Sequence, residues 1–147
     1  MKAIDIMNKI VELERDVNTA ARKVAMLKSM AERITSSFEQ EVVSHSRNVH
    51  SFEDSILQLS EAKDELNAVS KKYSLLFNFI TDVMNKLENS DDEDLLCGYF
   101  MEHMPLTEIS VKLHHAKTWG YRRYYVALEN LDALLVNIPV DQFPDIA

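Results

Sequence analysis

The chain has 147 residues, a net charge of −8 and one cysteine, Cys97. It contains only two glycines and three prolines, and such a small number of turn-forming residues disfavours an all-β sandwich. A single cysteine excludes an intrachain disulfide and is typical of a reducing compartment, and no apolar run approaches the roughly 18 residues of a membrane span. We therefore expect an all-α, soluble, cytoplasmic protein without a membrane segment.

A long first helix is predicted from about Ala3 to Phe38. Its apolar residues recur at alternating steps of three and four, which is the a/d seam of a coiled coil. The members of this seam are Ala3, Ile6, Ile10, Leu13, Val17, Ala20, Val24, Leu27, Ala31, Ile34 and Phe38. The residues between them carry charges of both signs, which is typical of a solvated helix face and not of a nucleic-acid interface.

The pattern fails from Glu39 to Ser51, where polar residues follow no period, and a loop is predicted there. A second helix is predicted from about Phe52 to Glu88. Its seam consists of Leu59, Ala62, Leu66, Val69, Tyr73, Leu76, Ile80, Val83 and Leu87, with Phe52 one heptad earlier. Matched lengths and a short connection predict a long antiparallel helical hairpin, a coiled-coil rod, over residues 1–88.

The apolar stripe of the second helix is wider than a two-helix seam. The flanking residues that widen it are Ile56, Leu75, Phe77, Phe79 and Met84. A hairpin alone would leave them exposed, so either the C-terminal region or a second copy of the chain must cover them. Of these two possibilities we favour a homodimer of hairpins.

An acidic segment, Asn89–Asp94, separates the hairpin from a small helix-turn-helix domain predicted over residues 89–136. Ser90 is followed three residues later by Glu93, which is the spacing of a capping box, and the other carboxylates favour a helix N-terminus. A calcium or magnesium site is a weaker interpretation, because no glycine-turned loop follows. The helix that begins here supplies Leu95, Leu96, Tyr99 and Phe100 to the domain core.

Two further helices are predicted, from about Leu106 to Leu113 and from about Lys117 to Leu135. The second repeats apolar residues at steps of three and four, which places Tyr121, Tyr124, Leu128, Leu131 and Leu135 on its core face. His114, His115 and Ala116 leave a short turn between the helices, as in a helix-turn-helix. Gly120 lies inside the second helix at a cost of about 1 kcal/mol relative to alanine.

The helix pair coincides with a basic island. From His103 to Leu128 the chain has four basic residues and one acidic residue, a net charge of +3, so the rest of the chain carries −11. A recognition helix places its N-terminal residues against base edges and phosphates. The candidate DNA-binding residues are Lys112, Lys117, Thr118, Trp119, Arg122 and Arg123. On spacing and charge alone, an ordinary helical hairpin with a solvated basic face is the alternative.

The segment from Leu87 to Leu131 also carries three recognisable motifs. They are Thr107-Glu108-Ile109-Ser110 with Leu113, Tyr121-Arg122-Arg123-Tyr124, and Ala127-Leu128-Glu129-Asn130-Leu131. In these motifs the segment resembles the C-terminal domain of phage late transcription regulators of the ArpU and RinA type, which is similar to the promoter-reading helix-turn-helix of sigma factors. The resemblance implies a regulator that binds double-stranded DNA and activates phage late genes in the cytoplasm of a bacterial host, with RNA polymerase as a second candidate partner.

Enzyme chemistry has little support in the sequence. We find no glycine-rich phosphate loop, no nucleophile motif and no set of metal ligands, so no enzymatic activity, cofactor or metal is expected. The alternative function is a protein–protein interaction module, a coiled-coil adaptor with little or no DNA binding. A net charge of −8 favours this alternative, because phosphate contacts supply most non-specific affinity for DNA.

The tail covers residues 137–147. The last helix should end near Val136, because Pro139 cannot continue it. The tail is expected to pack on the body of the protein, to remain disordered or to dock on a partner.

Overall fold

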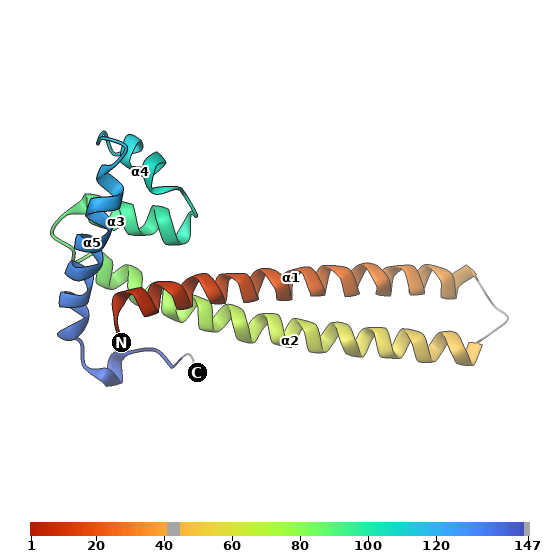
Figure 1. Cartoon of the computed structure of the whole chain (residues 1–147). Helices are drawn as coiled ribbons and strands as arrows, with labels where there is room; N and C mark the ends of the chain where they lie inside the picture. The colour runs from red at the N-terminus through yellow and green to blue at the C-terminus, as the bar shows by residue number, and fades with distance from the viewer. Residues whose placement is uncertain (41–44, 146–147) are drawn as a thin grey trace. The chain divides into compact units, whose positions relative to one another are not determined.

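The computed structural model describes residues 1–40 and 45–145, and it describes side chains outside residues 37–50. These residues form helices and include no strand. Two long helices, α1 (Ala3–Gln40) and α2 (His45–Met84), pack against each other as a hairpin (Figure 1). Shorter elements follow: α3 (Ser90–Leu96), a π-helical turn (Cys97–Met101), α4 (Leu106–Lys112), α5 (Trp119–Val136) and a 3-10 turn (Val140–Gln142). The prediction of an all-α hairpin followed by short helices is confirmed.

One compact unit of the molecule comprises residues 14–71, where α1 and α2 pair through the seam. Ala20, Ser55 and Ala62 are buried there. The larger seam residues of this unit are half-buried: Val17, Val24, Leu27, Ile34, Phe52, Leu59, Leu66 and Val69. Ser55 takes a seam position, and its hydroxyl has no hydrogen-bond partner among the described residues. Small side chains are therefore the most completely covered in this part of the hairpin.

The loop predicted from Glu39 to Ser51 is wrong over most of its length. α1 continues to Gln40 and α2 begins at His45, so only residues 41–44 are left, and these lie outside the described residues. No glycine or proline occurs in this stretch to stop a helix. The loss of the apolar period therefore did not mark the end of either helix.

The end of α2 was also placed too late by the sequence pattern. The helix stops at Met84, because the backbone N–H groups of Lys86 and Leu87 turn back to the carbonyl oxygens of Val83 and Met84, each at 3.0 Å. Leu87 still packs on the core, but from outside the helix.

The other compact unit comprises residues 1–13 and 72–147. Its core is shared between the shorter helices and the base of the hairpin, by which we mean the part of α1 up to residue 13 and the part of α2 from residue 72. The buried members are Ala3, Ile6, Met7, Ile10, Leu13, Leu76, Ile80, Val83, Met84, Leu95, Leu96, Phe100, Ile109, Ala127, Leu128, Leu131 and Leu135. The base of the hairpin therefore belongs to the same core as α3, α4 and α5, and independent folding of residues 89–136 stays a prediction.

Part of the wide apolar stripe on α2 is covered by the chain itself. Met84 is fully buried in the shared core, and Phe79 packs on Phe143 of the tail with ring centroids 5.0 Å apart. At these two positions the C-terminal region, rather than a second copy, provides the cover. Ile56 and Leu75 remain 47% and 46% exposed.

The N-terminal and C-terminal segments of this unit both contact the rest of it. The backbone N–H of Ala3, at the start of α1, donates to Asp132 Oδ1 on α5 at 2.6 Å. α5 ends at Val136, as predicted from Pro139, and Ile138 of the tail is half-buried against the core. None of the helices described is both long and apolar enough to cross a membrane.

Candidate nucleic-acid interface

The candidate interface is built on the first turn of α3. Asn89, not the predicted Ser90, is its N-cap: the backbone of Asn89 is extended, and its side chain accepts a hydrogen bond from the N–H of Asp91 at 3.0 Å. The helix thus begins at Ser90, whereas the predicted capping box needs Ser90 to be the residue before the helix. Asp91, Asp92 and Glu93 fall in the first turn, where the helix dipole favours negative charge.

Beyond Leu96 the helix widens into the π-helical turn. Gly98 lies there against Ile109, and a Cβ on Gly98 would come within 3.1 Å of Ile109 Cδ1. Two residues after this turn ends at Met101, His103 has a left-handed φ of 58°, and the N–H of Met104 bonds to the carbonyl oxygen of Gly98 at 2.9 Å. This turn buries Phe100 and leaves Tyr99 38% exposed.

Cys97 is the first residue of the π-helical turn, and its thiol is expected to be unreactive. Burial, followed by the nearby carboxylates of Glu93, Asp94 and Glu102, raises the pKa of the Cys97 thiol to about 11. The thiol therefore stays protonated at neutral pH, which disfavours a role as nucleophile or metal ligand.

α4 ends in a Schellman motif centred on His114. The N–H of His115 bonds to the carbonyl oxygen of Ser110 at 2.8 Å, and the N–H of His114 bonds to that of Val111 at 3.0 Å. His114 has a φ of 65°, in the left-handed position that glycine usually occupies.

The connection from α4 to α5 is longer than the predicted three-residue turn. It runs over residues 113–118, because a further turn, closed by the N–H of Trp119 on the carbonyl oxygen of Ala116 at 2.9 Å, follows the Schellman motif. Lys117 and Thr118 therefore precede α5 rather than lying in its first two turns, and Thr118 is the N-cap residue.

Gly120 is the point of closest approach between α4 and α5. Its N–H donates to Ser110 Oγ at 2.8 Å, and this hydroxyl donates to the carbonyl oxygen of Leu106 at 2.7 Å. A Cβ at position 120 would lie 2.6 Å from Ser110 Oγ and 2.7 Å from the Leu106 oxygen. The glycine that seemed costly for helix formation is thus required by packing.

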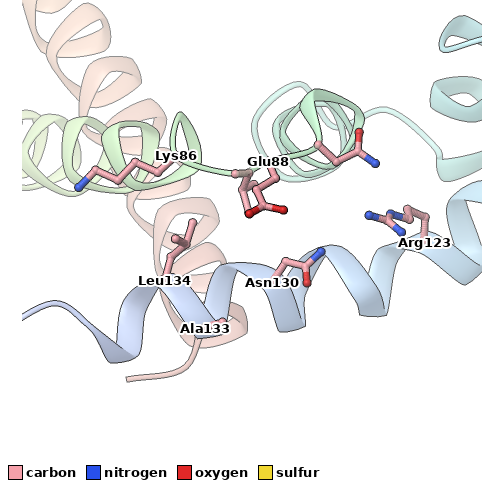
Figure 2. Close-up of a pocket in the computed structure, with 8 residues that line it drawn as sticks. Lys86, Glu88, Arg123, Asn130, Ala133 and Leu134 are labelled. Carbon is pink, nitrogen blue, oxygen red and sulfur yellow. The ribbon is translucent and has the colours of Figure 1, made fainter.

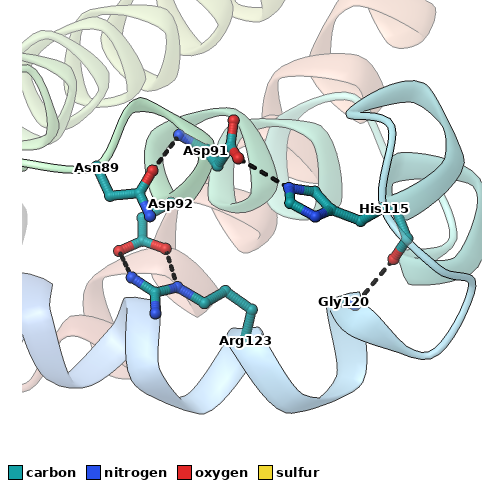
Figure 3. A network of polar contacts seen from close by, with 7 residues as sticks. Asn89, Asp91, Asp92, His115, Gly120 and Arg123 are labelled. Carbon is teal, nitrogen blue, oxygen red and sulfur yellow. Dashed lines mark hydrogen bonds and ion pairs between the residues drawn. The ribbon is translucent and has the colours of Figure 1, made fainter.

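Asp92 and Arg123 connect α3 to α5 (Figure 3). Asp92 is 1% exposed, and it accepts hydrogen bonds from Arg123 Nε and Nη2 at 2.6 and 2.8 Å and from Asn130 Nδ2 at 3.1 Å. The hydrogen bond to Asp92 raises the pKa of Arg123, so the guanidinium is firmly charged. Arg123, a candidate DNA contact, therefore directs its guanidinium to α3. Sequence reasoning missed both Asp92 and Asn130 as its partners.

His115 contacts both α3 and α5, and Figure 3 shows its contact with Asp91 of α3. Its Nε2 lies 2.9 Å from Asp91 Oδ2, and its ring stacks on Trp119 with centroids 3.9 Å apart and 7° between the planes. Trp119, another candidate DNA contact, is consequently half-buried and packed on the turn.

The core face of α5 differs from the predicted one at its N-terminal end. Gly120, Ala127, Leu128, Leu131 and Leu135 are buried, and Tyr124 is half-buried. Tyr121 is 56% exposed, so its assignment to the core is wrong. The contact of Gly120 with α4 sets the rotation of α5, and Tyr121 lies about 100° further round the helix.

Tyr124 is held by an aromatic cluster that links α5 to the π-helical turn. Its ring centroid lies 5.4 Å from that of Tyr99, 6.0 Å from that of Phe100 and 5.2 Å from that of Tyr125. Burial, and then the neighbouring Tyr99 and Tyr125, raise the pKa of Tyr124. The cluster supports Tyr125, which is itself 69% exposed.

The outward face of α5 carries Tyr121, Arg122, Tyr125 and Val126 in its N-terminal half, and all four are exposed. We call these four residues the outer face of α5. Among the other candidate residues, Lys112 and Lys117 are exposed and line one open cavity of about 680 Å³ beside α4. No carboxylate occurs in the sequence from residue 109 to residue 128. Within residues 109–128 every charged side chain is therefore basic, and the nearest carboxylates in the sequence are those of Glu108, which also lines the cavity, and Glu129.

A smaller cavity of about 360 Å³ lies between the α2–α3 connection and α5 (Figure 2). Its lining residues are Lys86, Leu87, Glu88, Asn89, Arg123, Asn130, Ala133 and Leu134. Charges of both signs face it, and Arg123 is already paired with Asp92. We therefore assign no ligand to this cavity.

Among the side chains that the structure describes, those of residues 1–36 and 51–145, no three His, Cys, Asp or Glu gather where they could hold a metal ion. Comparison of the chain with protein-family models, with curated proteins and with solved structures gives no match. The fold and site define a helical hairpin whose base shares a core with a helix-turn-helix pair, α4 and α5.

Proposed function

We propose that the chain is a DNA-binding transcription regulator in which α5 meets double-stranded DNA through its outer face. The observation that carries the proposal is the basic and aromatic outer face, which stands at the N-terminal half of the second helix of a helix-turn-helix pair and has no carboxylate within residues 109–128. A recognition helix contacts DNA with this part of its length.

The candidate residues take different roles in this proposal. Lys112, Lys117 and Arg122 are exposed and contact phosphates, and Thr118 stands exposed at the N-cap of α5. Arg123 and Trp119 act indirectly: their contacts with Asp92 and His115 hold α5 and the turn in place.

The regulatory role follows from the sequence resemblance to phage late transcription regulators. We propose activation of phage late genes in the cytoplasm of a bacterial host, with RNA polymerase as a protein partner. We also propose a homodimer through the hairpin, because Met26, Met30, Ile56 and Leu57 are between 41% and 64% exposed in the unit of residues 14–71. Light scattering at tens of micromolar should give twice the chain mass, and a monomer mass would exclude this dimer.

The DNA-binding proposal is tested by the salt dependence of affinity. We suggest fluorescence anisotropy with a labelled duplex of mixed sequence, comparing the unaltered chain with Lys117→Ala and Arg122→Ala. Each variant should bind more weakly and reduce the slope of log K against log salt by about one. Lys28→Ala, an exposed lysine of the hairpin, is the matched control and should leave the slope unchanged. Absence of salt-dependent binding by the unaltered chain would exclude the proposal.

A protein–protein interaction module is the second candidate function. The exposed apolar side chains of residues 14–71 and the net charge of −8 favour it. In that case the hairpin binds a protein partner, and Lys117→Ala and Arg122→Ala leave this binding unchanged.

A further inference from the structure

We infer that Tyr121 and Tyr125, which lie beside Arg122 on α5, read sequence by contacting thymine methyl groups in the major groove. The inference rests on the proposed DNA-binding function and extends it from phosphate attraction to the recognition of bases.

The placement of the two tyrosines fits this task. They are four residues apart on α5, so their side chains are neighbours on one helix face, about 5–6 Å apart at Cβ. They are 56% and 69% exposed, although large aromatic side chains are usually more deeply buried. Both lie in the first two turns of α5, the part of a recognition helix that reaches base edges.

The Tyr125 ring is pre-oriented by its neighbours. It packs edge-on against Tyr124 with centroids 5.2 Å apart, and Tyr124 is in turn held by Tyr99 and Phe100. A ring that is already oriented loses little conformational entropy when it binds.

Arg122 and Arg123, although adjacent, have opposite environments. Arg122 is exposed, and among the described residues its guanidinium has one long hydrogen bond, to Thr118 Oγ1 at 3.4 Å. It is therefore available for a guanine edge or a phosphate. Arg123 is fixed on buried Asp92, which sets the rotation of α5 and keeps Tyr121 and Tyr125 outward.

The chemistry of the major groove selects thymine as the target. Its C5 methyl is the apolar group that a DNA base pair presents there, and apolar side chains read it by contact. A tyrosine ring can cover this methyl while its hydroxyl remains in water or near a phosphate. Losing one buried methyl contact should weaken binding about fourfold.

The test begins with a selection of bound duplexes from a randomised library, using the full chain. Each thymine of the selected duplex is then replaced by uracil, which removes only the methyl group. We expect about fourfold weaker binding by the unaltered chain at one or more positions. Tyr121→Ala and Tyr125→Ala should bind the thymine duplex more weakly and lose the difference between thymine and uracil at the position each one reads.

The controls separate the inference from the proposed function. Val136→Ala, an exposed change at the far end of α5, should behave like the unaltered chain. Tyr121→Phe and Tyr125→Phe keep the ring and should retain the thymine preference, even if an alanine variant fails to fold. Salt-dependent binding without any difference between thymine and uracil would overturn the inference and leave the proposed function standing. A lack of salt-dependent binding to any duplex would overturn both.

Discussion

Arg123 donates two hydrogen bonds to the carboxylate of Asp92, which is 1% exposed to solvent. The two residues are 31 positions apart in the sequence, and their contact joins the second turn of α5 to the first turn of α3. Asn130 completes the site with a third hydrogen bond to the same carboxylate. The candidate DNA-reading helix is therefore oriented by an acidic residue outside the helix-turn-helix pair.

Asp92→Asn should destabilise the fold. The substitution keeps the shape of the side chain but leaves the Arg123 guanidinium without its counter-charge, and we expect a loss of roughly 2–4 kcal/mol. Urea denaturation measures this loss. Asp91→Asn is the matched control, because Asp91 is adjacent but about one-third exposed and should cost less. Equal losses for the two variants would contradict a special role for Asp92.

Gly120→Ala should destabilise the protein, although alanine is the better helix former by about 1 kcal/mol. The added Cβ would lie 2.7 Å from the backbone oxygen of Leu106, which cannot move without shifting α4. We expect a net loss of about 1–3 kcal/mol. Gly98→Ala meets side-chain rather than backbone atoms, Cδ1 and Cγ1 of Ile109 at 3.1 and 3.2 Å, and should cost less in the same thermal melts. A higher melting temperature for Gly120→Ala would show that the approach of the helices is looser.

His114→Gly should stabilise the protein by about 0.5–1 kcal/mol, because glycine adopts the left-handed conformation without a Cβ penalty. The observed φ of 65° is the reason for this expectation. His115→Gly is the comparison: it removes the contacts with Asp91 and Trp119 and should lower the melting temperature. A melting temperature of His114→Gly below that of the unaltered chain would contradict the prediction.

Cys97 should react slowly with iodoacetamide. Burial, foremost, raises the pKa of the thiol from 9.0 to about 11, so below pH 9 its thiolate fraction is about 100-fold lower than that of a free thiol. Alkylation at pH 8 should be slower than in the urea-unfolded chain by at least this factor, and equal rates would contradict the burial.

The same pKa shift affects stability at high pH. The unfolded chain loses the Cys97 proton first, so stability should fall as pH rises from 9.0 to about 11 and should be unaffected by this group below that range. Cys97→Ala removes this contribution and serves as the control for the other groups that titrate there.

The hairpin could be predicted from sequence because apolar residues at the spacing of a seam become buried when two helices pair. Ile6, Ile10, Leu76 and Ile80 sit on it and are 0–2% exposed. The start of α2 at His45 could not be found in this way, because residues 45–51 show no apolar period in the sequence.

The candidate site was harder to predict, because its geometry depends on contacts between distant residues. The period of α5 allowed Tyr121 in the core, but the close contact of Gly120 with α4 and the ion pair between α5 and α3 turn it outward. Arg123 stands in a basic run, but its partner Asp92 comes from another helix. A charge count cannot show which of two adjacent arginines is already paired.

The hydrogen bond from Ala3 to Asp132 spans 129 positions of the sequence, which has a consequence for synthesis. At about 5–20 residues per second, the ribosome needs on the order of ten seconds between the two residues. Residues 14–71 can pair as soon as they have emerged, whereas Ile6, Met7 and Ile10 must wait for α5 before their core is complete. We expect nascent chains that stop before α5 to expose this apolar surface and to recruit chaperones until the last helix is released.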